Sequence, residues 1–441
     1  MAKKKTRRDS DFRYGTHSGK VAWPAVGEAV GSRDVFDVLQ FLVPPGDDKT
    51  AYKNQLDAVK RAVEGLYRVG KPVSKLTLGK RVQALEQAAC DYLGAKYACF
   101  LTNATAGFEI AAKIAGLQPG DEVIAPAITF IASIIYPLSI GAKVVLADVD
   151  PRTINLDPAD VERKITKKTR MIIPVHVGGY PVDMGPIMRL AKKHDLVVLE
   201  DAAHAFGGRY RGKALGTIGH FGAYSFHEVK NVTSFGEGGL LVTNTKYGKE
   251  FSLARFLGID TSKPIDTWFY DVRLLDGMRG GYIAENDSST EIQAVGLLSQ
   301  MARVNRIIEH RRKVAETLNR RVAKLHGISG TPLDSKTAQG THHLYLLQID
   351  PDIVGADVQA LKAKLSERGI TQIPHFAPLY KFQVLQELGY DVAAVQAGCP
   401  VAEEAFTRRF THLPLYRLSP AQVKYMADAI VESVSELCAG R

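Results

Sequence analysis

The chain has 441 residues, of which 45% are hydrophobic and 24% are charged. This composition is typical of a globular protein, and the length allows about two or three domains with a sizeable core. Half of the formal charge of +10 comes from five basic residues near the N-terminus: Lys3, Lys4, Lys5, Arg7 and Arg8. A basic tail of this kind is typical of a solvated chain end, although it can also bind nucleic acid or a membrane surface.

Cysteine usage and hydropathy exclude several other classes. The four cysteines, none in a CxxC pair, are Cys90, Cys99, Cys399 and Cys438. They indicate reduced thiols in a cytoplasmic protein. The most apolar stretch, residues 130–147, is interrupted by Pro137, Gly141 and Lys143, so we do not expect it to span a membrane. No apolar segment follows the basic N-terminus, so no secretory signal is expected.

The predicted elements change along the chain from helices to alternating strands and helices. Apolar residues at helical spacing predict helices over residues 52–67 and 82–93. From Ala98 onward, apolar β-branched runs separated by turns or helical patterns read ACFLTN, DEVIAP, AKVVLADV, TRMIIPVHV and DLVVLED. This alternation predicts an α/β fold whose mainly parallel sheet is covered by helices on both faces.

The last third of the chain predicts a second, smaller α+β unit. A long amphipathic helix is expected from about Glu291 to Leu325. The patterns that follow predict a strand over residues 342–350 and helices over residues 355–369 and 419–437. We therefore divide the chain into an N-terminal extension (residues 1–43), a large domain (44–300) and a small C-terminal domain (301–441).

The stretch with the most chemical character is SFHEVKNVTSFGEGG, residues 225–239. It contains Lys230 and ends in a glycine-rich turn, where the backbone can approach a ligand closely. Upstream, the apolar run LVVLED ends in Asp201, at the strand end where ligands bind in parallel α/β sheets. This pair suits pyridoxal phosphate (PLP). The lysine would form a Schiff base with the cofactor, and the acid would keep the pyridine nitrogen protonated.

Neighbouring residues each allow a binding role and a structural one. Ser225 is placed to contact a phosphate. Ala104 and Thr105 open a helix at a strand end, which makes either an anion site or an ordinary helix start. His204 suits the ring oxygen of the cofactor or a structural role. Phe130 suits the face of the ring or the core.

Several motifs occur together in order: EDAAHAFG, SFHEVKN and GEGG, flanked by GLQPGDEVIAPAITFIAS, GGYPVDM, EIQAVGL, PHFAPLY, CPVAEEA and LPLY. Together they resemble the DegT/DnrJ/EryC1/StrS family of sugar aminotransferases over roughly residues 44–435. The resemblance implies a fold-type I PLP enzyme, which is a homodimer with active sites at the subunit interface.

Carried over onto matching positions, the resemblance makes Lys230 the catalytic lysine and Asp201 the partner of the pyridine nitrogen. It places His204 beside the ring oxygen, Phe130 on the ring face and His375 on the substrate side. The implied phosphate ligands are Ala104, Thr105 and Ser225, joined by Asn286 from the neighbouring subunit. No metal is implied.

The implied reaction moves an amino group from glutamate or glutamine to a keto sugar. The segment SFHxxKN is most similar to members that act on nucleotide-linked 4-keto-6-deoxyhexoses. The family's NYR motif reads Asn286-Asp287-Ser288 here, so its tyrosine and arginine are missing. This departure keeps open an alternative acceptor, a keto-cyclitol of the scyllo-inosose type in aminoglycoside-like biosynthesis.

Other function classes make different predictions. The family's dehydratase branch carries histidine in place of the lysine, so Lys230 argues against it. A regulatory protein on an inactive PLP fold, with its basic tail on nucleic acid, would not need the complete set of Lys230, Asp201 and Ser225. A NAD enzyme is disfavoured because no GxGxxG follows a strand, and neither a P-loop nor an HExxH metal motif occurs.

Overall fold

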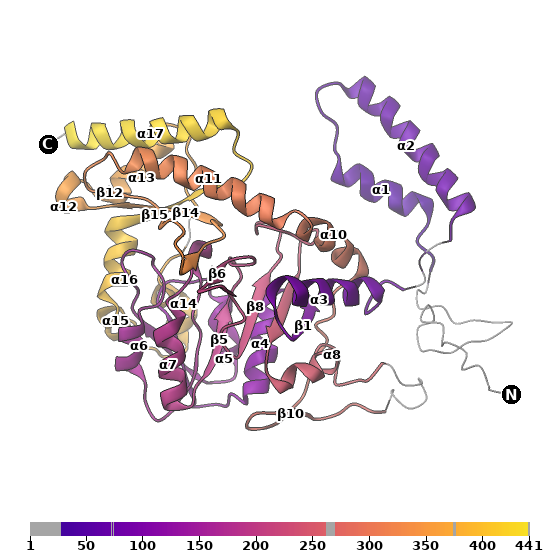
Figure 1. Cartoon of the computed structure of the whole chain (residues 1–441), viewed down its shortest axis with the longest axis horizontal. Helices are drawn as coiled ribbons and strands as arrows, with labels where there is room; N and C mark the ends of the chain where they lie inside the picture. Colours follow the sequence, from indigo (N-terminus) through magenta and orange to yellow (C-terminus); the bar gives the residue numbers. More distant parts are fainter. Residues whose placement is uncertain (1–27, 72, 74, 262–269, 374–375, 440–441) are drawn as a thin grey trace. The chain divides into compact units, whose positions relative to one another are not determined.

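The computed structural model describes residues 28–439 apart from residues 72, 74, 262–269 and 374–375 (Figure 1). They form two compact units, which we describe separately. One contains residues 81–258, 273–289 and 293–439, and the other contains the described residues before 81 together with 259–261, 270–272 and 290–292.

The smaller unit contains a pair of helices, α1 (Ser32–Leu42) and α2 (Lys49–Val69). The helix predicted over residues 52–67 is therefore confirmed and extends further at both ends. It begins earlier because the Asp48 side chain accepts a hydrogen bond from the Ala51 N–H (2.9 Å) and so caps the first turn. Gly70, in an extended conformation, ends it.

A seven-stranded sheet forms the centre of the larger unit. Its strands, in spatial order, are β1 (Tyr97–Leu101), β9 (Gly239–Thr243), β8 (Phe221–Ser225), β5 (Val197–Asp201), β4 (Thr169–Ile172), β2 (Glu122–Pro126) and β3 (Lys143–Ala147). The last five are parallel, and β9 is antiparallel to both of its neighbours. The predicted mainly parallel sheet is thus confirmed.

Helices cover both faces of this sheet because buried side chains alternate along each strand. Val123 and Leu199 pack in the same cluster as Phe108 of α4, whereas Ile124 and Val198 pack on the other face with Ile187 of α7. The covering helices are α3 (Lys80–Leu93), α4 (Ala104–Ala115), α5 (Ala132–Ser139), α6 (Pro158–Lys164), α7 (Met184–His194) and α8 (Phe251–Ala254). The helix predicted over residues 82–93 corresponds to α3.

The single helix predicted from Glu291 to Leu325 is wrong. The structure has two helices, α10 (Glu291–Met301) and α11 (Val304–Val322), separated at Ala302 and Arg303. Arg303 leaves the helical region with φ −126° and ψ 10°. Since both helices have a buried face, the apolar periodicity continues across the break and no proline or glycine marks it.

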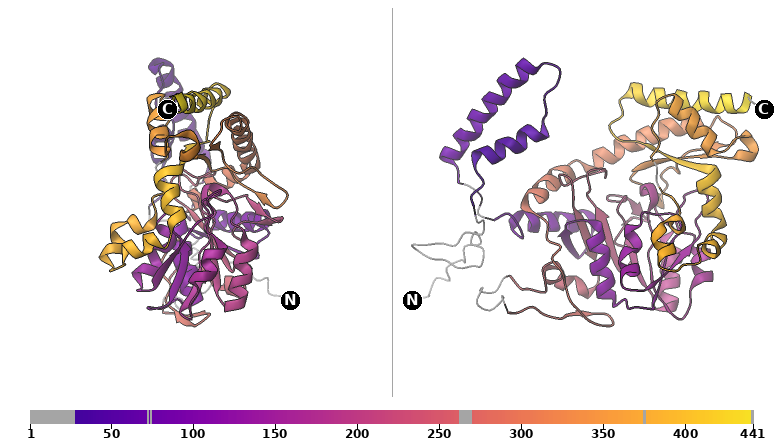
Figure 2. Two further views of the ribbon diagram at one scale, coloured as in Figure 1. Left: turned by 90° about the vertical axis from the view of Figure 1, so that its left-hand side faces the viewer. Right: turned by 180° about the vertical axis from the view of Figure 1, so that it is seen from behind.

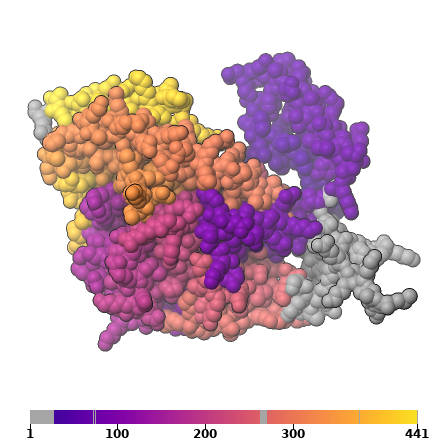
Figure 3. Space-filling model, viewed as in Figure 1, coloured from indigo at the N-terminus to yellow at the C-terminus, as the bar shows by residue number. Residues whose placement is uncertain are grey.

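A second, antiparallel sheet lies near the C-terminus, with strand order β12 (Ile328–Ser329), β14 (Leu344–Ile349) and β15 (Phe410–Pro414). It packs with α11, α13 (Val358–Glu367) and α17 (Pro420–Ala439) around one core. Figure 2 shows α17 beside α11, and Figure 3 shows α17 at the surface. These elements confirm the predicted C-terminal strand and helices. The domain division at residue 300 stays a prediction.

The remaining elements are short. They are β6 (Arg209–Tyr210), β7 (Lys213–Ala214), β10 (Leu275–Gly277), β11 (Gly280–Tyr282), β13 (Ala338–Gln339), α12 (Pro351–Val354), α14 (Gln383–Glu387), α15 (Val392–Ala397) and α16 (Pro400–Glu404). In the part of the chain that the structure describes, no helix is both long and apolar enough to cross a membrane.

Candidate active site

Most of the predicted site residues gather at one edge of the large sheet. Asp201 ends β5, and Ser225 ends the neighbouring parallel strand β8. Strand β1 points the same way as β8, because both are antiparallel to β9. Ala104 and Thr105, which begin α4 just after β1, therefore lie at the same edge. This is the carboxyl edge of the strands, where α/β sheets bind ligands.

Lys230 lies on a compact turn that follows β8. Backbone hydrogen bonds close the turn, from the Phe226 N–H to the Gly238 carbonyl (2.7 Å) and from the Glu228 N–H to the Gly236 carbonyl (2.8 Å). The Lys230 side chain is largely enclosed, and burial lowers the pKa of its amine to about 8, while the Asp201 carboxylate opposes the shift. The neutral, nucleophilic amine is therefore accessible near neutral pH.

Asp201 is 5% exposed and keeps two hydrogen bonds. One carboxylate oxygen accepts from the Ser133 hydroxyl (2.6 Å), and the other accepts from the Ala203 N–H (3.0 Å). Burial raises the pKa of this carboxyl, and the two hydrogen bonds and the charge of Lys230 oppose the rise. The carboxylate is thus more basic than usual, which suits a group that holds a proton on a neighbouring nitrogen.

Ser133 was missed by the sequence reasoning. It lies in the first turn of α5, and its hydroxyl is also 3.3 Å from the Thr129 hydroxyl. Its contact with Asp201 joins residues 68 positions apart. The sequence signal for it is the serine that closes PAITFIAS, the motif that also contains Phe130.

The start of α4 forms the part of the site that suits an anion. The Asn103 side chain caps the helix by accepting from the Ala106 N–H (2.9 Å). The first N–H groups of a helix, here including those of Ala104 and Thr105, have no intrahelical acceptor and attract negative charge. Ser225, at the end of β8, accepts a weak hydrogen bond from the His227 N–H (3.3 Å) and keeps its own hydroxyl proton to donate.

Gly239, the last residue of the GEGG run, has a role that the sequence did not predict. A Cβ atom at this position would lie 2.1 Å from the carbonyl carbon of Asn103 and 2.6 Å from the Ala104 nitrogen. Only glycine therefore allows β9 to begin against the first turn of α4. The sequence predicts that this glycine-rich turn lets the backbone approach a ligand closely. At Gly239 the structure shows a close approach to the start of α4, the helix that bears the anion site.

His204 is buried next to two other aromatic rings. The centroid of its ring lies 4.3 Å from that of His343 and 5.8 Å from that of Phe376, and both residues belong to the C-terminal part of the chain. The Thr341 hydroxyl donates to the His204 carbonyl (2.5 Å). Phe130, in contrast, is 58% exposed and does not pack in the core. Its contact with the cofactor ring stays a prediction.

Asn231, the residue after the lysine, connects the turn to the same C-terminal segment. Its amide nitrogen donates to the Thr341 carbonyl (3.0 Å), and its amide oxygen lies 2.9 Å from Nδ1 of His343. The sequence motif contains Asn231, but its partners lie more than 100 residues away. No local pattern indicates such a pair.

The roles predicted for Asn286 and His375 stay predictions. Asn286 is exposed, and its side-chain oxygen accepts from the Ser288 N–H (3.2 Å), so its contact with a neighbouring subunit stays a prediction. His375 lies outside the described residues. Close to it in the chain, Pro378 forms a β-bridge with Ile128, two residues before Phe130.

These groups fit PLP. The site offers an amine of lowered pKa, a buried carboxylate, and a helix N-terminus with a nearby serine hydroxyl for a phosphate. They would hold, in that order, the aldehyde carbon, the ring nitrogen and the phosphate of the cofactor. Among the described residues, no group of three or more His, Cys, Asp or Glu side chains is arranged to hold a metal ion.

Comparisons with known proteins agree with this site. The family model described as the DegT/DnrJ/EryC1/StrS aminotransferase family matches residues 64–431. A pleiotropic regulatory protein of Geobacillus stearothermophilus is 34% identical over 393 residues, which cover 88% of this chain and 98% of that protein. The GDP-perosamine synthase of Caulobacter vibrioides is 33% identical over 326 residues, which cover 74% and 84%.

Solved structures give the same answer. The PLP form of the putative sugar aminotransferase Spr1654 from Streptococcus pneumoniae is 27% identical, with a TM-score of 0.73, and the match covers 82% of this chain and 93% of that one. A PMP form matches equally well. A 3-amino-5-hydroxybenzoic acid synthase, also 27% identical, has a TM-score of 0.74 and covers 89% and 98%.

Fold, site and relatives together define a PLP-dependent aminotransferase of fold type I. The chain belongs to the DegT/DnrJ/EryC1/StrS aminotransferase family, and its cofactor is pyridoxal 5'-phosphate. The family, the fold class, the enzyme class and the cofactor predicted from the sequence are therefore confirmed.

Proposed function

We propose that this aminotransferase moves an amino group from glutamate or glutamine to a keto sugar, specifically a nucleotide-linked 4-keto-6-deoxyhexose. The observation that carries the proposal is the pairing of Lys230 and Asp201 at the carboxyl edge of the large sheet, where each affects the pKa of the other. The relative named GDP-perosamine synthase, and the neighbours named sugar aminotransferases, support a nucleotide-linked sugar as acceptor.

Each residue would have one task. The N–H groups of Ala104 and Thr105 and the hydroxyl of Ser225 would bind the phosphate, and Phe130 and His204 would contact the ring. Asp201, oriented by Ser133, would hold a proton on the ring nitrogen. When bound, PLP supplies a ring that withdraws electrons from the carbon next to the amino nitrogen. The Lys230 amine would take the proton from that carbon of the donor and later deliver a proton to the acceptor carbon.

We further propose a cytoplasmic homodimer with shared active sites, in which His375 binds substrate. The exposed position of Asn286 is compatible with reaching the cofactor phosphate of a second subunit. All four cysteines are free, which agrees with a reducing compartment.

A second acceptor class is favoured by one observation. Asp287 and Ser288 occupy the positions of the family motif's tyrosine and arginine, so a basic group that could bind a phosphorylated acceptor is missing there. Burial, with contributions from Glu109 and Glu285, raises the pKa of Asp287 to about 6. An uncharged keto-cyclitol would not need the arginine.

Acceptor assays with the purified holoenzyme separate the two. With glutamate or glutamine as donor, we expect turnover of a GDP- or dTDP-linked 4-keto-6-deoxyhexose, detected as an aminated product by mass spectrometry, and little turnover of scyllo-inosose. The reverse preference would favour the cyclitol. Turnover of neither acceptor, by protein that accepts the amino group from the donor, would contradict both proposals.

A further inference from the structure

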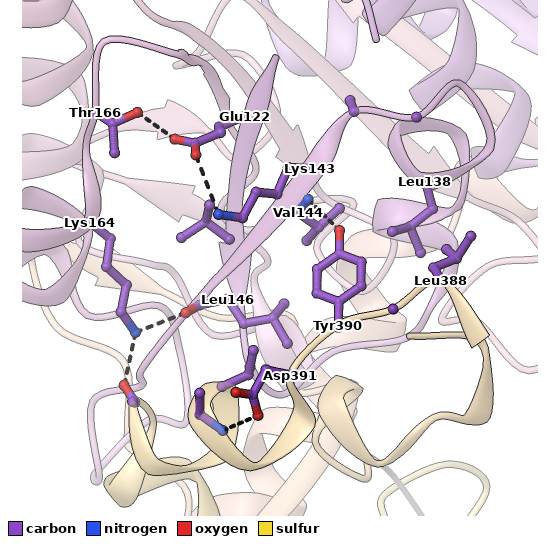
Figure 4. Close-up of a pocket in the computed structure, with 17 residues that line it drawn as sticks. Glu122, Leu138, Lys143, Val144, Leu146, Lys164, Thr166, Leu388, Tyr390 and Asp391 are labelled. Carbon is purple, nitrogen blue, oxygen red and sulfur yellow. Dashed lines mark hydrogen bonds and ion pairs between the residues drawn. The ribbon is translucent and has the colours of Figure 1, made fainter. Parts of the chain in front are cut away.

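A cavity of about 680 Å³ lies along the outer edge of the large sheet (Figure 4). One wall is β3, the last strand of the sheet, and the other comes from residues 388–398, around α15. Apolar side chains, Leu138, Val145, Leu388 and Val395, line much of it. Volume and lining are those of a small-molecule site, and neither the reaction nor the PLP-site residues use this cavity.

The edge strand carries backbone groups that point away from the sheet. In a parallel ladder, alternate residues direct both their N–H and their C=O to the same neighbour. Lys143 and Ala147 bond inward, to Asp121 and Ala127. Val144 and Leu146, between them, therefore direct their backbone groups toward the cavity that they line.

The two outer groups of this row are already occupied. The Val144 N–H donates to the Tyr390 hydroxyl (2.8 Å), and the Leu146 carbonyl accepts from the Lys164 amine (2.9 Å), as Figure 4 shows. Between them remain the Val144 carbonyl and the Leu146 N–H, to which no acceptor or donor among the described residues is bonded. Such a pair is what one residue of an added strand would bond with its own N–H and C=O.

The charges around the cavity favour a neutral ligand. Lys143 faces Glu122 (3.7 Å), and Lys164 pairs with Asp160 (2.8 Å). The Asp391 side chain accepts from the Ala394 N–H and caps α15. Because the two lysines have acidic partners and Asp391 has a backbone donor, each charged group is already ion-paired or hydrogen-bonded, and a neutral ligand need not displace any of them.

We propose that this edge cavity binds a neutral small molecule that carries one amino-acid residue between two amide groups, with an apolar side chain. The residue's N–H donates to the Val144 carbonyl, its C=O accepts from the Leu146 N–H, and its apolar side chain lies against Leu388 and Val395. A longer extended peptide cannot pair further along β3, since Tyr390 and Lys164 occupy the flanking backbone groups. The edge is thus closed to strand addition and open to a single residue.

The test is calorimetric titration of the holoenzyme with N-acetyl-L-leucine methylamide. We expect saturable binding with a Kd of about 1 mM or below. The analogue with an ester oxygen in place of the leucine N–H should bind roughly fivefold more weakly, the loss of one hydrogen bond. No saturation at about 10 mM ligand, or equal affinity of amide and ester, would overturn the proposal.

A matched pair of variants locates the site. Ala394 and Ala393 are adjacent exposed residues of α15, but only Ala394 lines the cavity. Ala394→Trp should fill the entrance and weaken binding by at least about tenfold, whereas Ala393→Trp should leave it unchanged. Melting temperatures and transaminase activity should be unchanged in both. Equal binding by wild type and Ala394→Trp would place the ligand elsewhere and contradict the assignment.

Discussion

Two adjacent carboxylates at the end of β5, Glu200 and Asp201, are both buried but have different partners. Glu200 points to one face, where His176 and three backbone N–H groups of residues 216–219 bond to it at 2.6–3.0 Å. Asp201 points to the other face and has two donors and the charge of Lys230. A carboxylate whose oxygens already accept four hydrogen bonds has a structural role. A carboxylate that accepts fewer hydrogen bonds and lies beside an amine can still accept one from a ligand.

Both ring nitrogens of His176, the histidine that contacts Glu200, also have hydrogen-bond partners. His176 is fully buried, and its Nδ1 accepts from the Val182 N–H (3.1 Å). Its proton therefore lies on Nε2, which donates to Glu200 (3.0 Å). We therefore expect substitutions of Asp201 and its partners to alter activity, and substitutions of Glu200 and its partners to alter stability.

The largest effect is expected at Lys230. Lys230→Ala should lower the rate of amino transfer by roughly 10³-fold or more, because the amine that would move the proton is lost. The unfolding transition should hardly change. Steady-state kinetics with glutamate measure the loss, and Lys213→Ala, an exposed lysine of β7, is the control. Retention of full activity in Lys230→Ala would rule out the proposed mechanism.

Asp201→Asn should come next. The amide can still donate to the Ser133 oxygen and accept from the Ala203 N–H, so the free energy of unfolding should stay within about 1 kcal/mol of wild type. Activity should fall by about 10²-fold because the charge that holds the ring proton is lost. An Asp201→Asn variant that is strongly destabilised but, while folded, keeps the activity of wild type would reverse the roles assigned to the two carboxylates.

Glu200→Gln should do the opposite. Each Glu200 oxygen accepts two hydrogen bonds, so the new NH2 group must face two donors whichever way the amide turns. We expect a loss of about 3 kcal/mol in the free energy of unfolding, measured by urea denaturation. Folded Glu200→Gln should keep most of its specific activity. An unchanged urea midpoint would contradict the structural role.

The pH dependence of cofactor uptake should also distinguish Asp201 from Glu200. Only the neutral Lys230 amine can attack the cofactor aldehyde, so the rate of PLP uptake by apoenzyme should rise about tenfold per pH unit and level off above about pH 8. Because the Asp201 charge raises the pKa of Lys230, Asp201→Asn should move the break to lower pH. Glu200→Gln should leave it in place. A rate that keeps rising tenfold per pH unit above about pH 9 would contradict the lowered pKa.

The smallest effect is expected at Ser133. Ser133→Ala removes one of the two hydrogen bonds that lower the pKa of Asp201, so this pKa should rise, and activity should fall about fivefold. The control is Ser139→Ala in the same helix, since Ser139 donates to the Tyr136 carbonyl at the exposed end of α5. Equal activity of the two variants would mean that Ser133 does not orient the carboxylate.

The sequence predicted the parts of this account that depend on local pattern. Asp201 was found because it ends an apolar strand, and Lys230 because a glycine-rich turn follows it. Ser133 and His343 were missed, since their partners are separated by 68 and 112 positions and no periodicity records such contacts. Strands β8 and β9 were also not predicted. Each strand has only five residues, including a glycine, and the two strands lie on either side of the lysine motif.

The separate roles of Lys230 and Asp201 are tested most directly by spectroscopy of the purified protein. Visible absorption is recorded before and after glutamate, followed by borohydride reduction and peptide mapping, in wild type, Asp201→Asn and Glu200→Gln. We predict a cofactor band that glutamate removes in wild type and in Glu200→Gln but removes far more slowly in Asp201→Asn. The reduced adduct should lie on Lys230. A colourless protein that takes up no PLP, or an adduct on another lysine, would contradict the account.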